Sequence, residues 1–381
     1  MDAIKEIQTS LEKKIETMAT SRFGNWKVAF MAAVISIIAI FGNIVPLDQY
    51  KKYFEALNSG QEYYAYSTAT DRARQFSVNH VYEAGSSLAN RTYRLTTAVF
   101  VRVFHLYPAS FWLYFIQLVL GIVFFKLLFQ FFSKTLNDPI AAFYAVIAIA
   151  TTYVGMSFWI DFSGYEDFYS YFFLFMAIYF RQPALIFIFT QLAFWNDERA
   201  FVAGGFVFLW WWFAPQWQAK KPISWTPNVQ MLVVVASWVF YWLVRYFYLT
   251  KHLGLHDTYD NSEFGRNLPA NLRVWGFKIG WGLEALWLVV VLAFVAMAWC
   301  KDYLRLLILV ACLVVNLVLS MTIYDTTRSS AFSYMVLFPC LVFLSQNTKQ
   351  KRLRNILLLV ALACFLHPLA TKTSAMGFFL M

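Results

Sequence analysis

The stretch FYSYFFLFMAIYFRQPALIFIFTQLAFW, Phe168 to Trp195, decides the fold because it is apolar on both sides of one short polar break. Each half is shorter than the roughly 20 residues that a helix needs to cross a bilayer. Joining the halves into one helix would place Arg181 and Pro183 at mid-membrane, where a charge is costly and a proline interrupts the helix. The stretch therefore predicts two helices, at about 168–180 and 184–195, joined by a turn.

The rest of the chain has the same apolar character. Of its 381 residues, 60% are hydrophobic, 20% are aromatic and only 14% are charged, whereas a soluble domain averages about a quarter charged residues. The apolar runs are continuous, which is typical of helices and not of β-barrel strands. We therefore predict an all-α, polytopic membrane protein with about eleven spans, at about 28–45, 109–133, 139–160, 168–180, 184–195, 200–214, 229–249, 280–299, 304–323, 331–346 and 355–370.

The chain divides into three regions. In residues 1–27, apolar side chains recur every three to four residues, which predicts an amphipathic helix that lies on the cytoplasmic membrane surface or packs on the rest of the protein. Residues 28–371 are predicted to form a single transmembrane domain that includes a long extracytoplasmic loop, 46–108, and residues 372–381 a short tail. The first apolar run is expected to be a span, because no small-residue cleavage site follows it.

Basic residues indicate the orientation of this domain. If the N-terminus is cytoplasmic and the spans alternate, the inside turns receive Lys134, Arg181, Lys220, Lys221, Lys301, Arg305, Lys349, Lys351, Arg352 and Arg354. This agrees with the rule that cytoplasmic loops carry the excess of lysine and arginine. The net charge of +10 is explained in this way without nucleic-acid binding. The expected location is a membrane that the chain crosses several times, with the N-terminus in the cytoplasm.

The opposite face collects the acidic segments. It receives loop 46–108, WIDFSGYEDFY, WNDERAF, loop 250–279 and YDTTRSS, which carry Asp161, Glu166, Asp167, Asp197, Glu198, Asp257, Asp260, Glu263 and Asp325. These segments are distant in sequence, yet the predicted topology brings them to one membrane face. We therefore expect a site at the boundary between membrane and water.

Two of these segments place acidic residues beside an arginine at the start of a span. Asp197 and Glu198 precede Arg199, and Asp325 lies three residues before Arg328. Both patterns fit a capped helix start with local ion pairs. Both also fit a polar cavity in which arginine offers a forked donor to phosphate. The sequence leaves the two interpretations open, and their occurrence on one face favours the second.

Other polar groups give weaker signals. Asp161, Glu166 and Asp167 lie among aromatic residues, as in sugar-binding sites, but Trp and Tyr also gather at membrane interfaces. His252 and His256 have a spacing that can bind a metal on a helix, although Gly254 between them weakens the helix. No nucleotide-binding motif is present. We predict no particular cofactor and leave a divalent metal ion open.

The layout resembles the GT-C type of integral-membrane glycosyltransferases, particularly bacterial members. The long loop directly after the first span begins with VPLDQYKKYF, which contains Asp48, and ends with NRTYRLTTAVFVRVF, which contains Arg94. The turn FWNDERAFV is similar to the N-R-E-x-A type turn of such enzymes. YDTTRSSAFSYMVLFP is similar to their D-x-x-R…P segment before a late span. The resemblance covers most of the chain in layout, and it implies a location in the bacterial inner (plasma) membrane.

The resemblance implies inverting transfer of a sugar from a polyprenyl-phosphate donor to a glycan or lipid acceptor on the extracytoplasmic face. An acidic residue of the first loop would be the general base: Asp48 matches best, with Asp71, Glu55 and Glu62 as substitutes. One base suffices for such a transfer. Arg94, Arg199 and Arg328 would neutralise the departing phosphate. The first loop lacks a close pair of acidic residues, which leaves metal dependence and catalytic activity open.

Three other classes of protein remain as alternatives. A transporter or flippase for lipid-linked saccharides would place charges near mid-membrane on broken helices. A non-catalytic protein of the same fold needs no acid pair. A membrane acyltransferase would need a buried histidine, for which His367 is the candidate. The expected partners are the lipid-linked donor, the acceptor and membrane lipids, with no nucleic acid.

Overall fold

The computed structural model describes residues 2–41, 47–78, 91–219, 221–256, 268–322 and 326–366, and these residues form helices and no strands. The first half contains α1 (Asp2–Thr20), α2 (Gly24–Phe41), α3 (Leu47–Asn58), α4 (Tyr66–Arg74), α5 (Thr96–Phe104), α6 (Ala109–Leu136), α7 (Pro139–Ala150), α8 (Tyr153–Ile160), α9 (Asp167–Tyr179) and α10 (Pro183–Phe194). The second half contains α11 (Glu198–Gln218), α12 (Val229–Leu243), the π-helix η1 (Val244–His252), α13 (Leu268–Arg273), α14 (Trp275–Leu283), α15 (Leu286–Trp299), α16 (Tyr303–Met321), α17 (Thr326–Ser330), the 3₁₀-helix η3 (Ala331–Val336), α18 (Leu337–Asn347) and α19 (Gln350–Leu366). The predicted all-α class is confirmed for this part of the chain.

Four helical segments of the described chain are long and apolar enough to cross a membrane: Ala109–Leu136, Val229–His252, Tyr303–Met321 and Thr326–Asn347. Two bent pairs, α7 with α8 at 55° and α14 with α15 at 92°, raise the number to six if each pair is one span. The predicted count of about eleven spans is therefore not confirmed. Helices such as α10, with 12 residues, have a length of about 18 Å, against a hydrocarbon core of about 30 Å.

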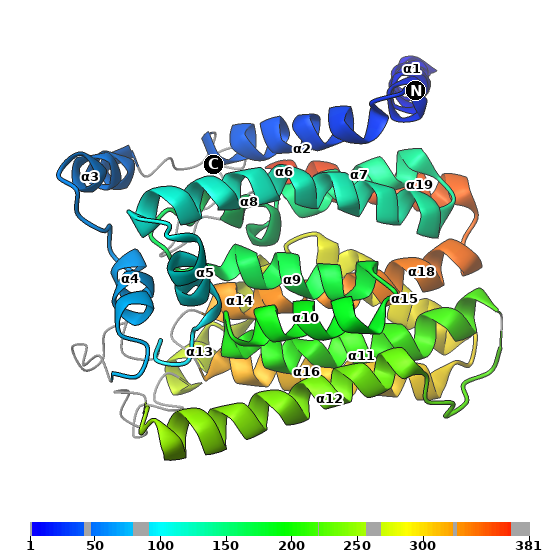
Figure 1. Cartoon of the computed structure of the whole chain (residues 1–381). Coiled ribbons are helices and arrows are strands. Elements are labelled where there is room, and N and C mark those ends of the chain that lie inside the picture. The colour runs from blue at the N-terminus through cyan, green and yellow to red at the C-terminus, as the bar shows by residue number, and fades with distance from the viewer. Residues whose placement is uncertain are drawn as a thin grey trace.

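The stretch 168–195 forms two helices, as predicted. α9 ends at Tyr179 and α10 begins at Pro183, which occupies the first helical position, where its missing N–H is not needed. The two helices contact one another closely along the bundle (Figure 1). Arg181 therefore lies in a turn at a helix end and not inside a helix.

Local chemistry explains the bend between α7 and α8. The hydroxyl of Thr151 donates to the carbonyl oxygen of Ile147 at 3.0 Å, and the hydroxyl of Thr152 donates to that of Ile149 at 2.9 Å. These hydroxyls share the carbonyl groups with backbone N–H groups, since the N–H of Thr151 also donates to Ile147 and that of Thr152 to Ile149, and such bonds often bend a helix. A Cβ on Gly155 would lie 2.4 Å from the Cα of Ala150, so only glycine fits this close approach. The sequence prediction of one run, 139–160, missed this break.

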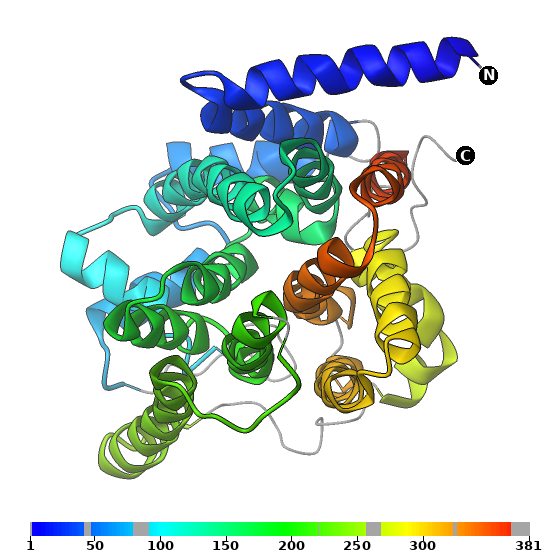
Figure 2. The same ribbon diagram turned by 90° about the vertical axis from the view of Figure 1, so that its right-hand side faces the viewer.

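The predicted inside turns meet at one end of the bundle. Arg305 donates to the carbonyl oxygen of Lys221 at 2.9 Å, and Arg354 pairs with Asp138 at 2.6 Å. The amphipathic helix α1 lies at this end and runs across the direction of α2, as Figures 1 and 2 show. Glu12 of α1 lies 3.8 Å from Arg354, while Ile7 and Leu11 are exposed. A helix is present within residues 1–27, although α1 ends at Thr20 and α2 begins at Gly24; the cytoplasmic position of α1 and its contact with a membrane stay predictions.

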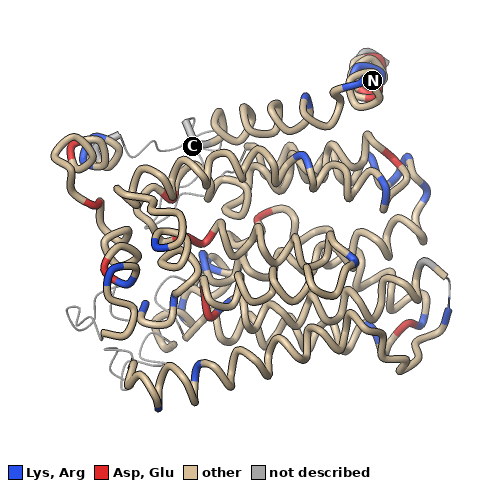
Figure 3. Tube along the Cα trace, viewed as in Figure 1, with Lys and Arg blue, Asp and Glu red and all other residues tan. Residues whose placement is uncertain are grey.

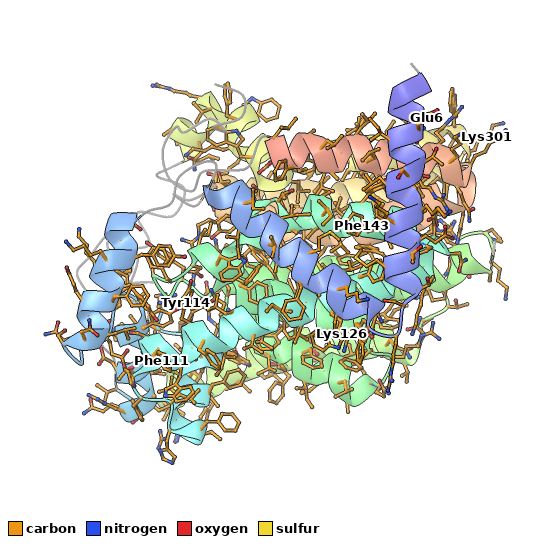
Figure 4. All side chains as sticks on the ribbon, turned by 90° about the horizontal axis from the view of Figure 1, so that it is seen from above. Glu6, Phe111, Tyr114, Lys126, Phe143 and Lys301 are labelled. Carbon is orange, nitrogen blue, oxygen red and sulfur yellow. The ribbon has the colours of Figure 1, made fainter. Side chains whose placement is uncertain are left out.

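The long first loop folds at the opposite end of the bundle, where it forms α3, α4 and α5 (Figure 1). The hydroxyl of Tyr53 on α3 donates to the carbonyl oxygen of Ser110 at 2.9 Å, and that of Tyr50 to Trp159 at 2.8 Å. Tyr114 on α6, labelled in Figure 4, donates to the same carbonyl oxygen at 2.7 Å. α3 is thereby fixed beside the end of α8. The helix predicted near Leu95–Val103 is present as α5, and the described part of the loop, 47–78 and 91–108, contains three helices.

Candidate functional site: a buried ionic cluster

Four acidic residues and four arginines from separate segments meet in one cluster at the end of the bundle that carries α3, α4 and α5. We call this the ionic cluster; its members are Asp161, Glu166, Asp167, Asp197, Arg91, Arg94, Arg199 and Arg328. They come from the segment before α5, the connection between α8 and α9, the first residue of α9, the N-cap and start of α11, and α17. Figure 3 shows that most charged residues lie toward the ends of the helices, while the middle of the bundle is largely uncharged.

Asp167 is the central carboxylate of the ionic cluster. One of its oxygens accepts from Arg199 Nη2 at 2.6 Å, and the other from Arg328 Nε at 2.5 Å. The hydroxyl of Tyr153 donates to the second oxygen at 3.0 Å. The Asp167 side chain has no exposed surface. One buried carboxylate therefore holds together Arg199 and Arg328, which are 129 positions apart in the sequence (328 − 199).

Asp197 caps α11 and also holds two arginines. Its Oδ1 accepts from the backbone N–H of Arg199 at 2.9 Å and from Arg199 Nε at 2.8 Å. Its Oδ2 accepts from Arg199 Nη2 at 2.6 Å and lies 2.9 Å from Arg94 Nη2. The first interpretation that the sequence left open is therefore correct at Asp197, which caps α11. Asp197 also belongs to a buried set of ion pairs, and the binding of a phosphate by these arginines stays a prediction.

Arg91 and Glu166 form a second part of the ionic cluster, beside the contacts of Asp167 and Asp197. Arg91 donates to the carbonyl oxygens of Ala65, Gly164 and Tyr165 at 3.0, 2.6 and 3.0 Å, so it ties α4 to the α8–α9 connection. Its Nη2 lies 3.8 Å from Glu166 Oε2, which also accepts from the hydroxyl of Thr97 at 2.9 Å. Arg91 is a member that the sequence prediction missed, because its neighbours in sequence gave no charged pattern.

Three of the four arginines of the ionic cluster form its more exposed side, while Arg91 is buried. The side chains of Arg94 and Arg199 are each 14% exposed and that of Arg328 is 10% exposed, whereas Asp167 and Asp197 are 0% and 1% exposed. These three guanidinium groups therefore lie nearer the surface than the two carboxylates that hold them. Several guanidinium groups at one surface are suited to bind an anion such as a phosphate.

Burial affects the titration of the acidic residues unequally. Burial, followed by the charge of Asp167, raises the pKa of Asp161 to about 6. Burial also raises the pKa of Glu166 to about 7, although Arg91 and Thr97 oppose the shift. Burial alone would raise the pKa of Asp197 too, but Arg199 and Arg94 outweigh it and hold that pKa below its usual range. The arginines therefore favour the ionised form of Asp197, whereas burial favours the protonated form of Glu166.

Comparison with protein-family models, with curated proteins and with solved structures finds no match for this chain. The site is therefore interpreted from its own residues.

The other predicted site residues lie outside the ionic cluster. Glu198 is 45% exposed and pairs with Arg245 at 2.8 Å, so it is part of a surface ion pair. Asp71 lies on α4 and makes none of the cluster contacts given above. Asp48 is in the first turn of α3, but its side chain lies outside the described residues. Asp325 also lies outside them, and Arg328 pairs with Asp167.

The two histidines do not share a helix. The π-helix ends at His252, and Gly254 follows with a φ of +66°. His256 lies beyond this turn, with its Nδ1 3.1 Å from the carbonyl oxygen of Gly254. Among the residues that the structure describes, no group of three or more His, Cys, Asp and Glu side chains is placed to hold a metal ion.

Glu62 has a structural role that argues against its use as a base. Its carboxylate accepts from the backbone N–H groups of Ala109 and Ser110, each at 2.8 Å, and from the hydroxyls of Ser110 and Thr70 at 2.6 and 2.8 Å. It therefore caps α6 from a distance of 47 positions in the chain. A carboxylate with four donors has little capacity to accept a proton from a substrate.

Replacing Glu62 by alanine is expected to destabilise the protein by about 1–3 kcal/mol, because two buried N–H groups at the start of α6 lose their acceptor. Thermal unfolding of the detergent-solubilised protein, followed by tryptophan fluorescence, measures the effect. Glu55→Ala is the control, since Glu55 is exposed and pairs only loosely with Lys51, at 4.0 Å. Equal stability of both variants would contradict the capping role.

Proposed function

We propose that this chain is a membrane glycosyltransferase of the GT-C type, which moves a sugar from a polyprenyl-phosphate donor to a glycan or lipid acceptor at the extracytoplasmic face. The single observation that supports this most is the exposed side of the ionic cluster, with Arg94, Arg199 and Arg328 anchored on buried carboxylates. The donor phosphate would bind there. The same proposal places the N-terminus in the cytoplasm of a bacterial cell and counts the short helices among about eleven membrane segments.

The arginines would act on the leaving group. During transfer, the acceptor oxygen bonds to the anomeric carbon while the bond from that carbon to the donor phosphate oxygen breaks, so negative charge grows on the phosphate. Guanidinium groups fixed in advance stabilise this charge without moving during the reaction. Asp167 and Asp197 provide that fixation, because together they contact all three arginines.

Asp48 is the proposed general base, which takes the proton of the acceptor hydroxyl. It precedes Tyr50 by two positions on α3, and Tyr50 donates to the carbonyl oxygen of Trp159 at 2.8 Å. Trp159 lies two positions before Asp161 of the ionic cluster. The start of α3 is thus held on the same end of the bundle as the arginines, which supports the assignment.

Replacing Asp48 by asparagine is expected to reduce sugar transfer about 100- to 10,000-fold, the usual contribution of a general base. The measurement is transfer of radiolabelled sugar from polyprenyl-phosphate donor in membranes, alongside thermal stability of the purified variant. Asp71→Asn, on the neighbouring helix α4, is the matched control. Unchanged transfer in Asp48→Asn would exclude Asp48 as the base; loss in Asp71→Asn alone would reassign the role.

A transporter or flippase for lipid-linked saccharides is the second candidate, and the bent helix pairs favour it. α14 and α15 meet at 92°, and Glu284 at the break has a φ of +50°. Broken helices of this kind occur at transporter sites. Purified protein in liposomes would distinguish the two: the enzyme releases polyprenyl phosphate from the donor, whereas a flippase moves the intact donor between leaflets.

A further inference from the structure

Glu166 has an unusual position within the ionic cluster. Its side chain is 2% exposed, and one oxygen, Oε2, accepts from Thr97 at 2.9 Å. Within the described residues, the other oxygen, Oε1, is buried and accepts no hydrogen bond. A buried carboxylate with an unused oxygen is costly as an anion and much less costly with a proton on that oxygen.

The neighbours of Glu166 do not supply the hydrogen bond that Oε1 lacks. Arg91 Nη2 is 3.8 Å away, beyond hydrogen-bond distance, and donates instead to the carbonyl oxygens of Gly164 and Tyr165. Asn196 donates to the backbone oxygen of Glu166 at 2.8 Å, and its own Oδ1, within the described residues, is a second buried acceptor without a donor. Acceptors therefore exceed donors around this carboxylate, and a proton would supply the missing donor.

The charged and titratable groups around Glu166 belong to four parts of the chain: α4, the segment before α5, the end of α8, and α9. Arg91 and Arg94 precede α5, Asp161 ends α8, Tyr169 belongs to α9 and Tyr66 to α4. Asp161 differs from Glu166 because both of its oxygens are used: they accept from the backbone N–H groups of Tyr165 and Asp167 at 2.9 and 3.2 Å. Glu166 is therefore the member of the cluster best suited to accept a proton.

An anion on the exposed arginines changes this balance. With every group ionised, the four arginines and four carboxylates of the ionic cluster cancel. An added negative charge in this poorly solvated region disfavours the ionised form of the nearest carboxylate that has no full set of donors. We propose that the arginine site binds its anion together with one proton, which Glu166 takes up on Oε1. This rests on the proposed phosphate site and adds its proton coupling.

The sign of the pH dependence follows from this linkage. Below pH 7, Glu166 already carries its proton, so anion affinity is highest and independent of pH. As the pH rises above 7, each binding event must take up a proton, and affinity falls by up to about tenfold per pH unit. The anion affinity stops falling at pH values above the pKa that Glu166 has when the anion is bound.

Sulfate is the probe, because it does not titrate in this range and carries the charge of a phosphate group. Isothermal titration calorimetry on the full chain in detergent, in two buffers of different ionisation enthalpy, gives both the affinity and the number of protons taken up. For the wild type we expect close to one proton per sulfate at pH 8 and close to none at pH 6. For Glu166→Gln we expect none at either pH, with affinity at pH 8 as high as at pH 6.

Two further variants test whether the pH dependence of sulfate binding belongs to Glu166. Glu198→Gln, an exposed acid on the same face, is expected to keep the wild-type pH profile. Thr97→Val, which removes the hydrogen bond that favours ionised Glu166, is expected to move the fall in affinity to higher pH. The Thr97 variant tests the inference even if Glu166→Gln does not fold.

Three outcomes would overturn the inference in distinguishable ways. Equal sulfate affinity at pH 6 and pH 8 without proton uptake would show an anion site that is not proton-coupled. Proton uptake that persists in Glu166→Gln and disappears in Asp161→Asn would assign the proton to Asp161. A folded wild type that binds no sulfate at any pH would reject the phosphate site itself, and with it the proposed function.

Discussion

Replacing Asp167 by asparagine is expected to destabilise the protein by about 3–5 kcal/mol, the usual cost of removing one partner from a buried ion pair. Asp167 is fully buried and accepts from both Arg199 and Arg328, so the neutral side chain leaves two guanidinium groups short of an anion. An asparagine also turns one acceptor oxygen into an N–H donor that faces a guanidinium donor. The packing of α9, α11 and α17 at this end of the bundle depends on that carboxylate.

The measurement is the loss of folded, monodisperse protein on heating in detergent. Glu198→Gln is the matched control: it removes a carboxylate of the same charge at the start of α11, but from a side chain that is 45% exposed and largely solvated. We expect little change in that variant. If Asp167→Asn were as stable as Glu198→Gln, the ionic cluster would contribute nothing to the fold at this end of the bundle.

Replacing Arg199 by lysine is expected to weaken sulfate binding about 10- to 100-fold, although the charge is retained. Arg199 contacts Asp197, Asp167 and Ser329 at the same time, through Nε, Nη2 and Nη1. A lysine ammonium is a single point charge and cannot keep this forked arrangement. Loss of one hydrogen bond between charged groups is worth about 1.5–3 kcal/mol, which corresponds to the expected change in affinity.

Arg102→Lys is the control for this substitution, because Arg102 lies exposed on α5 and outside the ionic cluster. Thermal stability is recorded for both variants, so that weaker binding can be separated from unfolding. A folded Arg199→Lys protein with wild-type affinity would show that Arg199 supports the fold and does not bind the anion. Arg94 or Arg328 would then have to bind it without Arg199.

How much of the site the sequence could predict is clearest at Asp197 and Arg199. Their positions, two residues apart at the start of an apolar run, indicated a cap or a polar cavity, and the structure shows the cap together with a buried ion pair. The contact of Arg199 with Asp167, 32 positions away, needed the predicted turn at 181–183, which brings the starts of α9 and α11 to one end. The predicted topology placed Asp167 and Arg199 at the same membrane face, and only the packing of the helices brought them into contact.

Arg91, Glu62 and the span count could not be predicted in this way. Arg91 has no acidic neighbour in sequence, and its contacts with Ala65, Gly164 and Glu166 depend on how loop 46–108 folds on the bundle. Glu62 resembled a base on composition alone, until the structure placed it over the start of α6. The bend at Thr151 and Thr152 divides an apolar run that hydropathy treats as continuous.

The sequence by itself predicted a helical chain with several apolar segments, and the described residues are helical with four to six candidate spans. It could do so because hydropathy and charge are local properties, averaged along each helix. Only the tertiary structure decided which charges pair, which carboxylates are buried and which arginines stay partly exposed. Those properties depend on contacts between distant segments, since the energy of an ion pair changes steeply with distance and burial.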